Sequence, residues 1–181
     1  MQVKKNNEEV LYSDEKITQV TAEDIAYLKE QALKNERKRI RLCAHRDVHD
    51  SLHEMLIVHA QDTYVRPHRH LNKSESFHVI EGVVDVVIYE ENGSIKEVIS
   101  LGDYASGRCF FYRINDPFYH TLLIRSDFVV FHETTNGPFN REETEFAPWS
   151  PQETHTDAVR KFMEQLSQAV ASIDPGLTRR S

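Results

Sequence analysis

The sequence has few cysteines and no long apolar run. Its two cysteines, Cys43 and Cys109, could form at most one disulfide, and two free thiols are the simpler expectation in a reducing compartment. No run of apolar residues approaches the ~20 that a membrane-spanning helix needs. The first residues also lack the apolar stretch of a secretory signal. We therefore expect a cytoplasmic protein without a membrane partner.

Basic residues are in the minority. Lys and Arg number 22 against 29 Asp and Glu, which gives a formal net charge of −7. A chain of this charge is repelled by phosphate backbones, so nucleic acid is not an expected partner. The sequence also lacks internal repeats, low-complexity segments and a linker rich in Pro, Gly or Ser. Its 181 residues, 39% of them hydrophobic, predict one domain with its own core.

Apolar residues recur at helical spacing near both ends of the chain. Thr21 and Asp24 hold the positions of a capping box, and the run that follows predicts an amphipathic helix over residues 21–38. A second run predicts a helix over residues 154–173, which Asp174-Pro175-Gly176 would end. The expected organisation is an N-terminal extension and helix (1–38), a barrel (39–150), and a C-terminal helix and tail (151–181).

Between the two helices the apolar period changes to two, which predicts β-strands. Asn92-Gly93 is a strong hairpin signal because both residues tolerate positive φ. Many short strands separated by polar turns predict an all-β antiparallel sandwich or barrel. Strands are expected over residues 39–45, 54–60, 63–68, 76–81, 83–90, 95–100, 109–114, 119–124 and 128–133.

The most informative pattern is His68-Arg69-His70, which is followed by Glu75 and Gly82. Successive side chains of a strand point to opposite faces, so the two histidines project the same way. Glu75 follows a polar stretch that could turn the chain and bring a carboxylate back to the same place. The spacing predicts a metal site, and its donors suit divalent Fe, Mn, Ni, Co, Cu or Zn. The sequence leaves the choice of metal open.

The same string matches the first motif of the cupins, H-x-H-x4-E-x6-G. This resemblance implies a jelly-roll barrel, the double-stranded β-helix, and a fourth metal ligand later in the chain. His120 is the matching donor. The second cupin motif is matched only in part, because Ile124 stands where that motif has Asn.

Three longer segments of the sequence resemble one particular group of cupins, the WbuC family of bacterial cupin-fold metalloproteins. The resemblance covers roughly residues 35–153 and brings no defined reaction. It implies a link to O-antigen and other surface-polysaccharide genes, and hence a sugar or nucleotide-sugar substrate. The matching strings are Thr63–His70, Glu133–Phe139 and Phe146–Pro151.

Two polar residues upstream of the histidines are candidates for the surroundings of the ion. Tyr64 and Arg66 lie at even offsets from His68, so a regular strand would turn both into the barrel. An inward Arg66 would bind a substrate carboxylate or phosphate. The alternative is that it pairs with a structural carboxylate such as Glu133 or Asp85.

Candidates for moving a proton are Glu133, Tyr64 and His78. Glu133 ends an apolar strand and could act as a general base or accept a hydrogen bond from a ligand imidazole. His78 lies three residues beyond Glu75, so a regular strand would turn it away from the ligands, and a surface role competes with a catalytic one. Tyr112 could bind substrate in the pocket or fill the core.

A second group of histidines, His45, His49 and His53, has helical spacing. The polar residues between them favour a loop over a second metal site.

Three functions stay open on the sequence alone. In the first, the ion acts as a Lewis acid on a sugar-derived substrate, with isomerase-like or epimerase-like chemistry. The second is an iron-dependent dioxygenase, and the third is a non-catalytic module that binds or senses a small molecule. We also expect a homodimer in which residues 1–20 contribute an extended segment to the interface. The alternative is that both helices pack on their own barrel.

Overall fold

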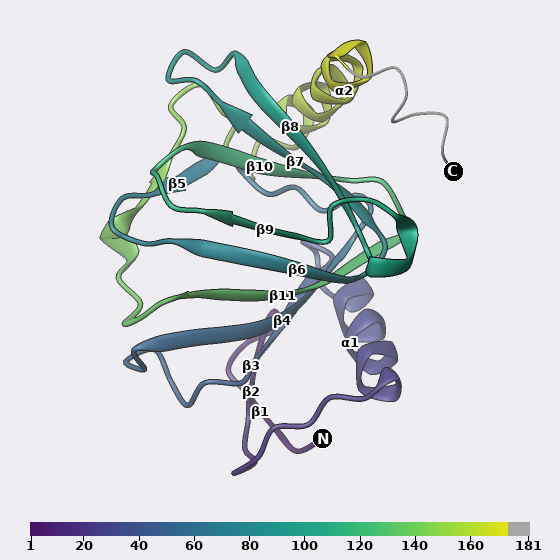
Figure 1. Cartoon of the computed structure of the whole chain (residues 1–181), viewed down its shortest axis with the longest axis vertical. Coiled ribbons are helices and arrows are strands. Elements are labelled where there is room, and N and C mark those ends of the chain that lie inside the picture. Colours follow the sequence, from purple (N-terminus) through teal and green to yellow (C-terminus); the bar gives the residue numbers. More distant parts are fainter. Residues whose placement is uncertain (174–181) are drawn as a thin grey trace.

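A computed structural model describes residues 1–173 of the chain. Two β-sheets face each other, and a helix lies on the outer side of each sheet (Figure 1). The all-β core with two flanking helices agrees with the predicted fold class. Neither helix of the described residues is long and apolar enough to cross a membrane. The expected stop at Asp174-Pro175-Gly176 and the tail after it lie outside the described residues.

The larger sheet has seven strands in the order β1-β2-β3-β4-β11-β6-β9. Its neighbouring strands are antiparallel except β2 and β3, which are parallel. Its strands are β1 (Val3–Lys5), β2 (Val10–Ser13), β3 (Arg39–Cys43), β4 (Leu52–Ala60), β6 (Glu75–Glu81), β9 (Phe111–Ile114) and β11 (Phe128–Asn136).

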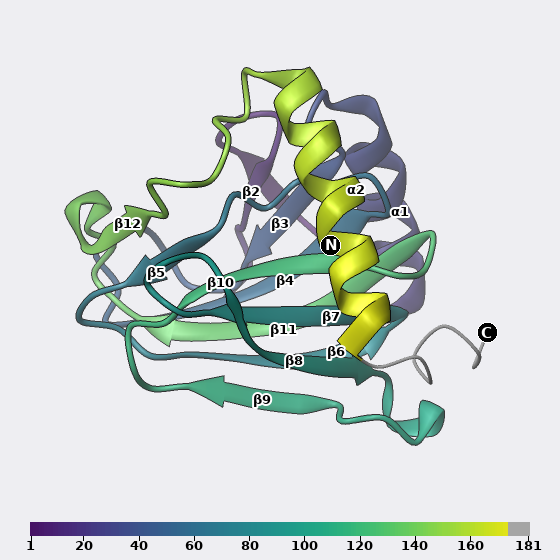
Figure 2. The same cartoon turned by 90° about the horizontal axis from the view of Figure 1, so that it is seen from above.

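The smaller sheet has five antiparallel strands in the order β12-β5-β10-β7-β8. Figure 2 shows the helix α2 (Thr156–Ile173) lying across it. Two short 3-10 helices, Tyr104–Ser106 and Arg141–Glu143, lie in the connections. The strands of this sheet are β5 (His68–His70), β7 (Val83–Tyr89), β8 (Ile95–Gly102), β10 (Tyr119–Ile124) and β12 (Thr144–Phe146).

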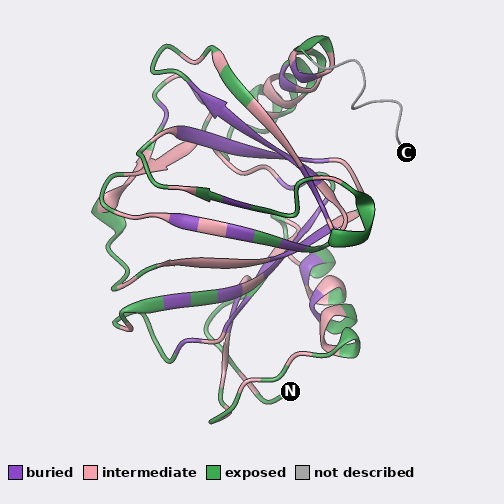
Figure 3. Ribbon diagram, in the orientation of Figure 1, coloured by how far each residue is buried: buried purple, intermediate pink, exposed green. Residues whose placement is uncertain are grey.

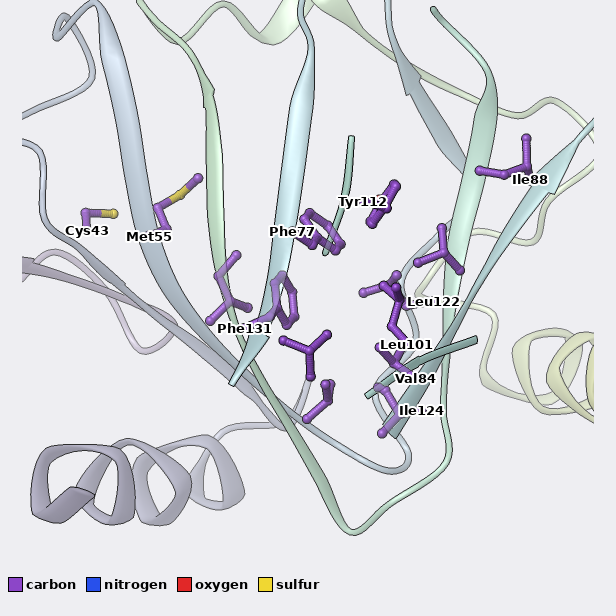
Figure 4. Packing of buried hydrophobic residues seen from close by; sticks show 14 of the residues in the cluster. Cys43, Met55, Phe77, Val84, Ile88, Leu101, Tyr112, Leu122, Ile124 and Phe131 are labelled. Carbon is purple, nitrogen blue, oxygen red and sulfur yellow. The ribbon is translucent and has the colours of Figure 1, made fainter. Parts of the chain in front are cut away.

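The main core fills the space between the two sheets (Figure 4). The rings of Phe131 on β11 and Phe77 on β6 are tilted by 32° with centroids 4.5 Å apart, and Tyr112 of β9 meets Phe77 edge-on at 5.1 Å. Leu122 and Ile124 of β10 reach the same cluster from the smaller sheet. Every residue of β10 is buried, because the core covers one face of this strand and α2 covers the other (Figure 3).

The first helix, α1 (Ala22–Lys34), begins at the predicted capping box. The Thr21 hydroxyl accepts a hydrogen bond from the Asp24 amide, and the Asp24 carboxylate accepts one from the Thr21 amide. Leu28 and Ala32 are fully buried against the outer face of the larger sheet. The helix ends four residues before the expected residue 38, because the side chain of Asn35 bonds both backbone groups of Arg39 and turns the chain into β3.

Gly82, the last residue of the cupin-like motif, occupies the turn between β6 and β7. Its φ is +86°, a conformation that L side chains rarely adopt. A Cβ at this position would collide with the backbone carbonyl of Phe128. The glycine of the motif is therefore required by the backbone conformation and the tight packing of this turn.

The N-terminal residues correct one expectation. Residues 1–20 form no free extended segment, because β1 and β2 join the chain's own larger sheet, β2 beside β3. Val10 and Leu11 are 7% and 4% exposed and pack in two different clusters on opposite faces of that sheet. The homodimer itself stays a prediction, which light scattering tests.

The buried imidazole of His59, on β4, should make the stability of the fold depend on pH in the acid range. Burial, with a smaller contribution from Arg37 and Arg41, lowers the pKa of His59 to about 3. In the unfolded chain this imidazole takes up a proton near pH 6.5, so between the two pKa values the unfolded state binds more protons. Stability contributed by neutral His59 is present above this window and is lost as the pH falls, by up to roughly 1.4 kcal/mol per pH unit.

We expect His59→Leu to flatten the acid limb of a plot of unfolding free energy against pH, measured by urea denaturation. The matched control is the exposed His155→Leu, which leaves the profile unchanged. An unaltered slope in His59→Leu would contradict the assignment.

Candidate metal centre

Three strands from both sheets bring the predicted ligands together. His68 and His70 alternate with Arg69 on β5 and so share one face. His120 of β10 lies directly opposite His68 in the antiparallel register. Glu75 opens β6 in the other sheet, after the turn at residues 71–74 has carried the chain across.

The four side chains converge. One ring nitrogen each of His68, His70 and His120 lies within 4.8 Å of the others. The carboxylate of Glu75 places one oxygen 2.9 Å from Nε2 of His120 and the other 3.3 Å from Nε2 of His70. Glu75 and His120 are 4% and 2% exposed, so this is a buried cluster.

The other ring nitrogen of each histidine is already engaged. Nδ1 of His68 lies 2.9 Å from the backbone carbonyl of Arg66, and Nδ1 of His120 lies 3.0 Å from that of Phe118. A carbonyl can only accept, so Nδ1 donates in both rings and Nε2 is the nitrogen that faces the centre; Nε2 of His120 donates to the Glu75 carboxylate and would bind an ion after releasing its proton. Nδ1 of His70 lies 3.2 Å from the Thr144 hydroxyl. This is how proteins orient imidazoles that bind a metal through Nε2, so the residues fit a divalent ion.

The charges of the cluster suit the same role. Burial lowers the pKa of His68 to about 3, so its imidazole is neutral at physiological pH. Burial would raise the pKa of Glu75, but the adjacent imidazoles, His120 first, outweigh it and hold that pKa well below its usual value. Burial would lower the pKa of His120, but the Glu75 carboxylate outweighs it and raises that pKa above its usual value. Metal ions bind neutral imidazole and ionised carboxylate, so an ion entering this cluster would displace a proton from His120.

Tyr112 supports the cluster from behind. It is buried, and its hydroxyl donates to the Glu75 carboxylate over 3.4 Å. Of the two roles open to it, substrate binding and core filling, the structure shows the second: Tyr112 packs in the main core and is not among the residues that line the cavity beside the centre. Its observed contact is with a ligand carboxylate, which it helps to orient.

A cavity of about 280 Å³ opens beside the cluster, over the concave face of the larger sheet. Both His70 and Glu133 line it. Glu133 faces inward from β11, opposite Met55 and Phe77 in the register. Burial, and then the Glu75 carboxylate, raise the pKa of Glu133 to about 8. Both forms of this carboxyl group are therefore populated near neutral pH, which suits a group that accepts and returns a proton.

The structure does not bring His78 into the site. It is exposed on the outer face of β6, opposite Phe111 and His132 in the register, and its ring lies 5.6 Å from Phe110. Strand alternation separates it from Glu75, three residues earlier.

Tyr64 and Arg66 also lie away from the centre. The Tyr64 hydroxyl donates to the Pro151 carbonyl over 3.0 Å, and Nε of Arg66 donates to the Ser150 hydroxyl over 3.0 Å. The guanidinium of Arg66 covers the Phe146 ring at 4.7 Å. Residues 63–67 form no strand, so the parity argument that turned both side chains inward does not apply.

The carboxylates offered as partners of Arg66 take other positions. Asp85 pairs with Arg125 at 2.6 Å, and Glu133 stands in the cavity. Arg66 therefore pairs with neither of these carboxylates, and it does not line the cavity beside the centre. Its binding of a substrate anion stays a prediction.

Three polar residues that line the cavity were not predicted from the sequence as part of a site: Arg41, Lys73 and His53. A signal existed for Arg41, which alternates on β3 with Ile40 and Leu42. Those two pack under α1, so Arg41 must face the concave side.

The second histidine group forms no metal cluster. Within residues 1–173 the group of potential metal ligands is His68, His70 and His120. His45 and His53 instead stack in parallel at 4.0 Å.

One prediction concerns the hydroxyl that supports His70. We expect Thr144→Val to weaken metal binding by roughly 10- to 100-fold, the usual cost of losing such a contact. Competition of Zn²⁺ with a chelating dye measures the change. Thr134→Val, which removes a hydroxyl from the outer face of β11, is the matched control. Equal affinity in the two variants would show that Thr144 does not orient His70.

Comparisons with known proteins bear on the fold. A family model described as a domain of unknown function (DUF6016) matches residues 20–101. A search of the curated proteins finds no match. Among solved structures, CapF with the inhibitor 3-isopropenyl-tropolone is 16% identical at a TM-score of 0.50, over 62% of this chain and 32% of that chain.

Two bacterial proteins are similar at slightly lower scores. A Klebsiella pneumoniae protein with a double-stranded β-helix domain is 11% identical at a TM-score of 0.47, over 60% of this chain and 79% of that chain. A Shewanella oneidensis protein is 12% identical at a TM-score of 0.46, over 57% of this chain and 66% of that chain. The chain therefore spans 32% of CapF and 66% of the Shewanella protein. At these identities the likeness concerns the fold alone, which is the double-stranded β-helix, or jelly roll, expected from the sequence, with a helix on each side.

Proposed function

We propose that the protein is a metal-dependent enzyme in which His68, His70, Glu75 and His120 hold a divalent transition metal. One observation carries the proposal. The buried carboxylate of Glu75 meets Nε2 of two histidines, while Nδ1 of every histidine in the cluster is engaged elsewhere. When bound, such an ion would act as a Lewis acid on an oxygen of a small molecule.

Glu133 is the group proposed to move the proton. It shares the cavity with His70, and its carboxyl group is populated in both protonation states near neutral pH. In its ionised form it accepts a proton from a carbon next to a carbonyl group. That carbon bears a hydroxyl group, and Glu133 then returns the proton to the former carbonyl carbon, while the hydroxyl proton passes to the former carbonyl oxygen. The hydroxyl-bearing carbon becomes the new carbonyl, so the reaction is an isomerisation without gain or loss of atoms.

The substrate class rests on the resemblance to the WbuC family. That resemblance favours a sugar or nucleotide-sugar derivative of bacterial surface-polysaccharide metabolism. The cavity beside the centre is compatible with a small oxygen-rich ligand, because carboxyl, hydroxyl, amide and imidazole groups line much of it.

The test begins with elemental analysis of protein purified without a histidine tag. The metal-loaded protein is then incubated anaerobically in D₂O with a panel of sugar phosphates, sugar acids and nucleotide sugars, and exchange at carbon is followed by NMR. We expect close to one metal ion per chain, and deuterium entering one class of substrate.

The other outcomes count against the proposal in distinguishable ways. Oxygen consumption with a ferrous ion and no exchange would indicate a dioxygenase. Binding without turnover would indicate a sensing module. Failure to take up metal even after reconstitution would contradict the centre itself.

A further inference from the structure

We propose that Arg41 and Lys73 form an oxyanion-binding subsite in the outer part of the cavity, which holds a carboxylate or phosphate group of the substrate. The evidence for this subsite is the placement and the contacts of Arg41 and Lys73. That the bound anion belongs to a substrate whose other end lies at the metal centre rests on the proposed function.

The cavity is electropositive in an acidic protein. Arg41 and Lys73 both line it, and the carboxylate that lines it with them is Glu133. Two cationic side chains and one carboxyl group therefore line the cavity, although the chain as a whole carries −7. Such a cavity attracts anions.

Arg41 is positioned for this role by the strand it occupies. It lies opposite Ile57 in the register, on the concave face of the sheet. Arg39, the next arginine on that face, donates to the Glu9 carboxylate over 3.0 Å. The Arg41 guanidinium has no such hydrogen bond or ion pair within residues 1–173. A guanidinium offers five donors in a planar fork that matches a carboxylate or phosphate.

Lys73 approaches the cavity from the turn between β5 and β6. Its side chain is only 8% exposed, although it carries a full charge. Its ammonium group donates to the Pro138 carbonyl over 3.0 Å, and the nearest carboxylate, of Glu143, is 3.7 Å away. An ammonium has three donors, so a buried lysine with these contacts can take a further acceptor.

Neutral polar groups complete the wall. His45 and His53 stack on each other in the cavity wall, and burial lowers the pKa of both, so they add hydrogen-bonding groups without charge. Asn6 and Asn7, from the turn between β1 and β2, line the same cavity. The N-terminal hairpin that the sequence placed outside the barrel thus contributes to this wall.

The arrangement narrows the substrate class. A cavity of about 280 Å³ is at the small end of ligand sites. His70 and Glu133 stand in the same cavity as the two cations. The best-matching ligand is a small acid that carries a carboxylate or phosphate at one end and a carbonyl or hydroxyl group at the other. A sugar acid or sugar phosphate has this form.

The test measures binding of malonate and of inorganic phosphate to the full chain by isothermal titration calorimetry, with and without bound Zn²⁺. We expect binding of at least one anion in both forms. Arg41→Gln and Lys73→Gln should each weaken it about tenfold or more, as loss of a charge-assisted hydrogen bond does. Arg46→Gln, in the exposed loop after β3, is the matched control and should bind like the wild type. Circular dichroism establishes that each variant is folded.

The anion that binds is read from the same experiment. Stronger binding of malonate, with a large loss in Arg41→Lys, indicates a carboxylate held by the planar fork. Stronger binding of phosphate, with a smaller loss in Arg41→Lys, indicates a phosphate. Either result supports the subsite.

The subsite and the metal centre fail separately. Anion binding that Arg41→Gln and Lys73→Gln leave unchanged would overturn the subsite, as would no binding of either anion at millimolar concentration. Both results would leave the metal centre standing. Conversely, anion binding that depends on Arg41 in a protein unable to take up metal would support the subsite and overturn the proposed function.

Discussion

The His120→Ala variant is expected to lose its metal while both sheets persist. His120 lies in the middle of the cluster, with Nε2 2.9 Å from the Glu75 carboxylate, and its loss leaves three donors with poorer geometry. The metal affinity should fall by more than the roughly 10- to 100-fold that loss of a supporting contact costs. Elemental analysis after gel filtration measures the metal content, and circular dichroism reports the sheets.

Two further variants make this result interpretable. Loss of His120 removes a partner of the buried Glu75 carboxylate, which lowers the stability of that variant. His70→Ala removes a less buried ligand from the edge of the same cluster and should also lose the ion. His78→Ala, on the outer face of β6, is the matched control and should keep it. Full metal occupancy in both ligand variants would show that the ion, if present, binds elsewhere.

The Glu133→Gln variant is expected to lose turnover while it keeps the metal. The substitution preserves the shape of the side chain and removes the group that exchanges a proton, which should lower kcat by roughly 10²- to 10⁴-fold. Deuterium exchange into the substrate found in the D₂O screen measures this rate. Glu54→Gln, an exposed carboxylate on the neighbouring strand β4, is the matched control. Undiminished exchange in Glu133→Gln would remove Glu133 from the mechanism.

The same variant has a readout that needs no substrate. The pKa of Glu133 is raised from its usual 4.5 to about 8, so between these values the folded metal-free protein binds more protons than the unfolded chain. Its stability is then highest at the acid end of this window and falls as the pH rises. In Glu133→Gln the decline should be shallower, as thermal unfolding from pH 5 to pH 8 would show.

Local pattern was enough to predict three of the four side chains of the proposed metal centre. His68 and His70 fall in a strand, and alternation alone turns both to one face. Glu75 follows after a turn short enough to return it to the same place. His120 lies 45 residues beyond Glu75, and only the resemblance to the cupins pointed to it. Its pairing with His68 is a property of the sheet.

The surroundings of the ion could not be predicted in the same way. The argument for Tyr64 and Arg66 required a regular strand upstream of His68, but β5 has only three residues. The Thr63 hydroxyl bonds the Lys38 carbonyl, and the chain around it follows an irregular path. Parity counted along the sequence has no meaning where the backbone does not alternate.

Strands at the edge of the fold were missed for a related reason. β1, β2 and β12 have three or four residues each, too few to show an apolar period. Their placement depends on the long strands beside which they pair. The cavity wall depends on strand pairing too, because pairing brings Arg41 on β3 and Lys73 after β5 to the same cavity.

The central claim is most directly tested by anomalous X-ray diffraction from a crystal of the metal-loaded protein, collected at the absorption edge of the metal that elemental analysis identifies. The account predicts one strong anomalous peak about 2.0–2.3 Å from Nε2 of His68, His70 and His120 and from a carboxylate oxygen of Glu75. No peak among these four side chains, or a peak at His45 and His53 instead, would contradict it.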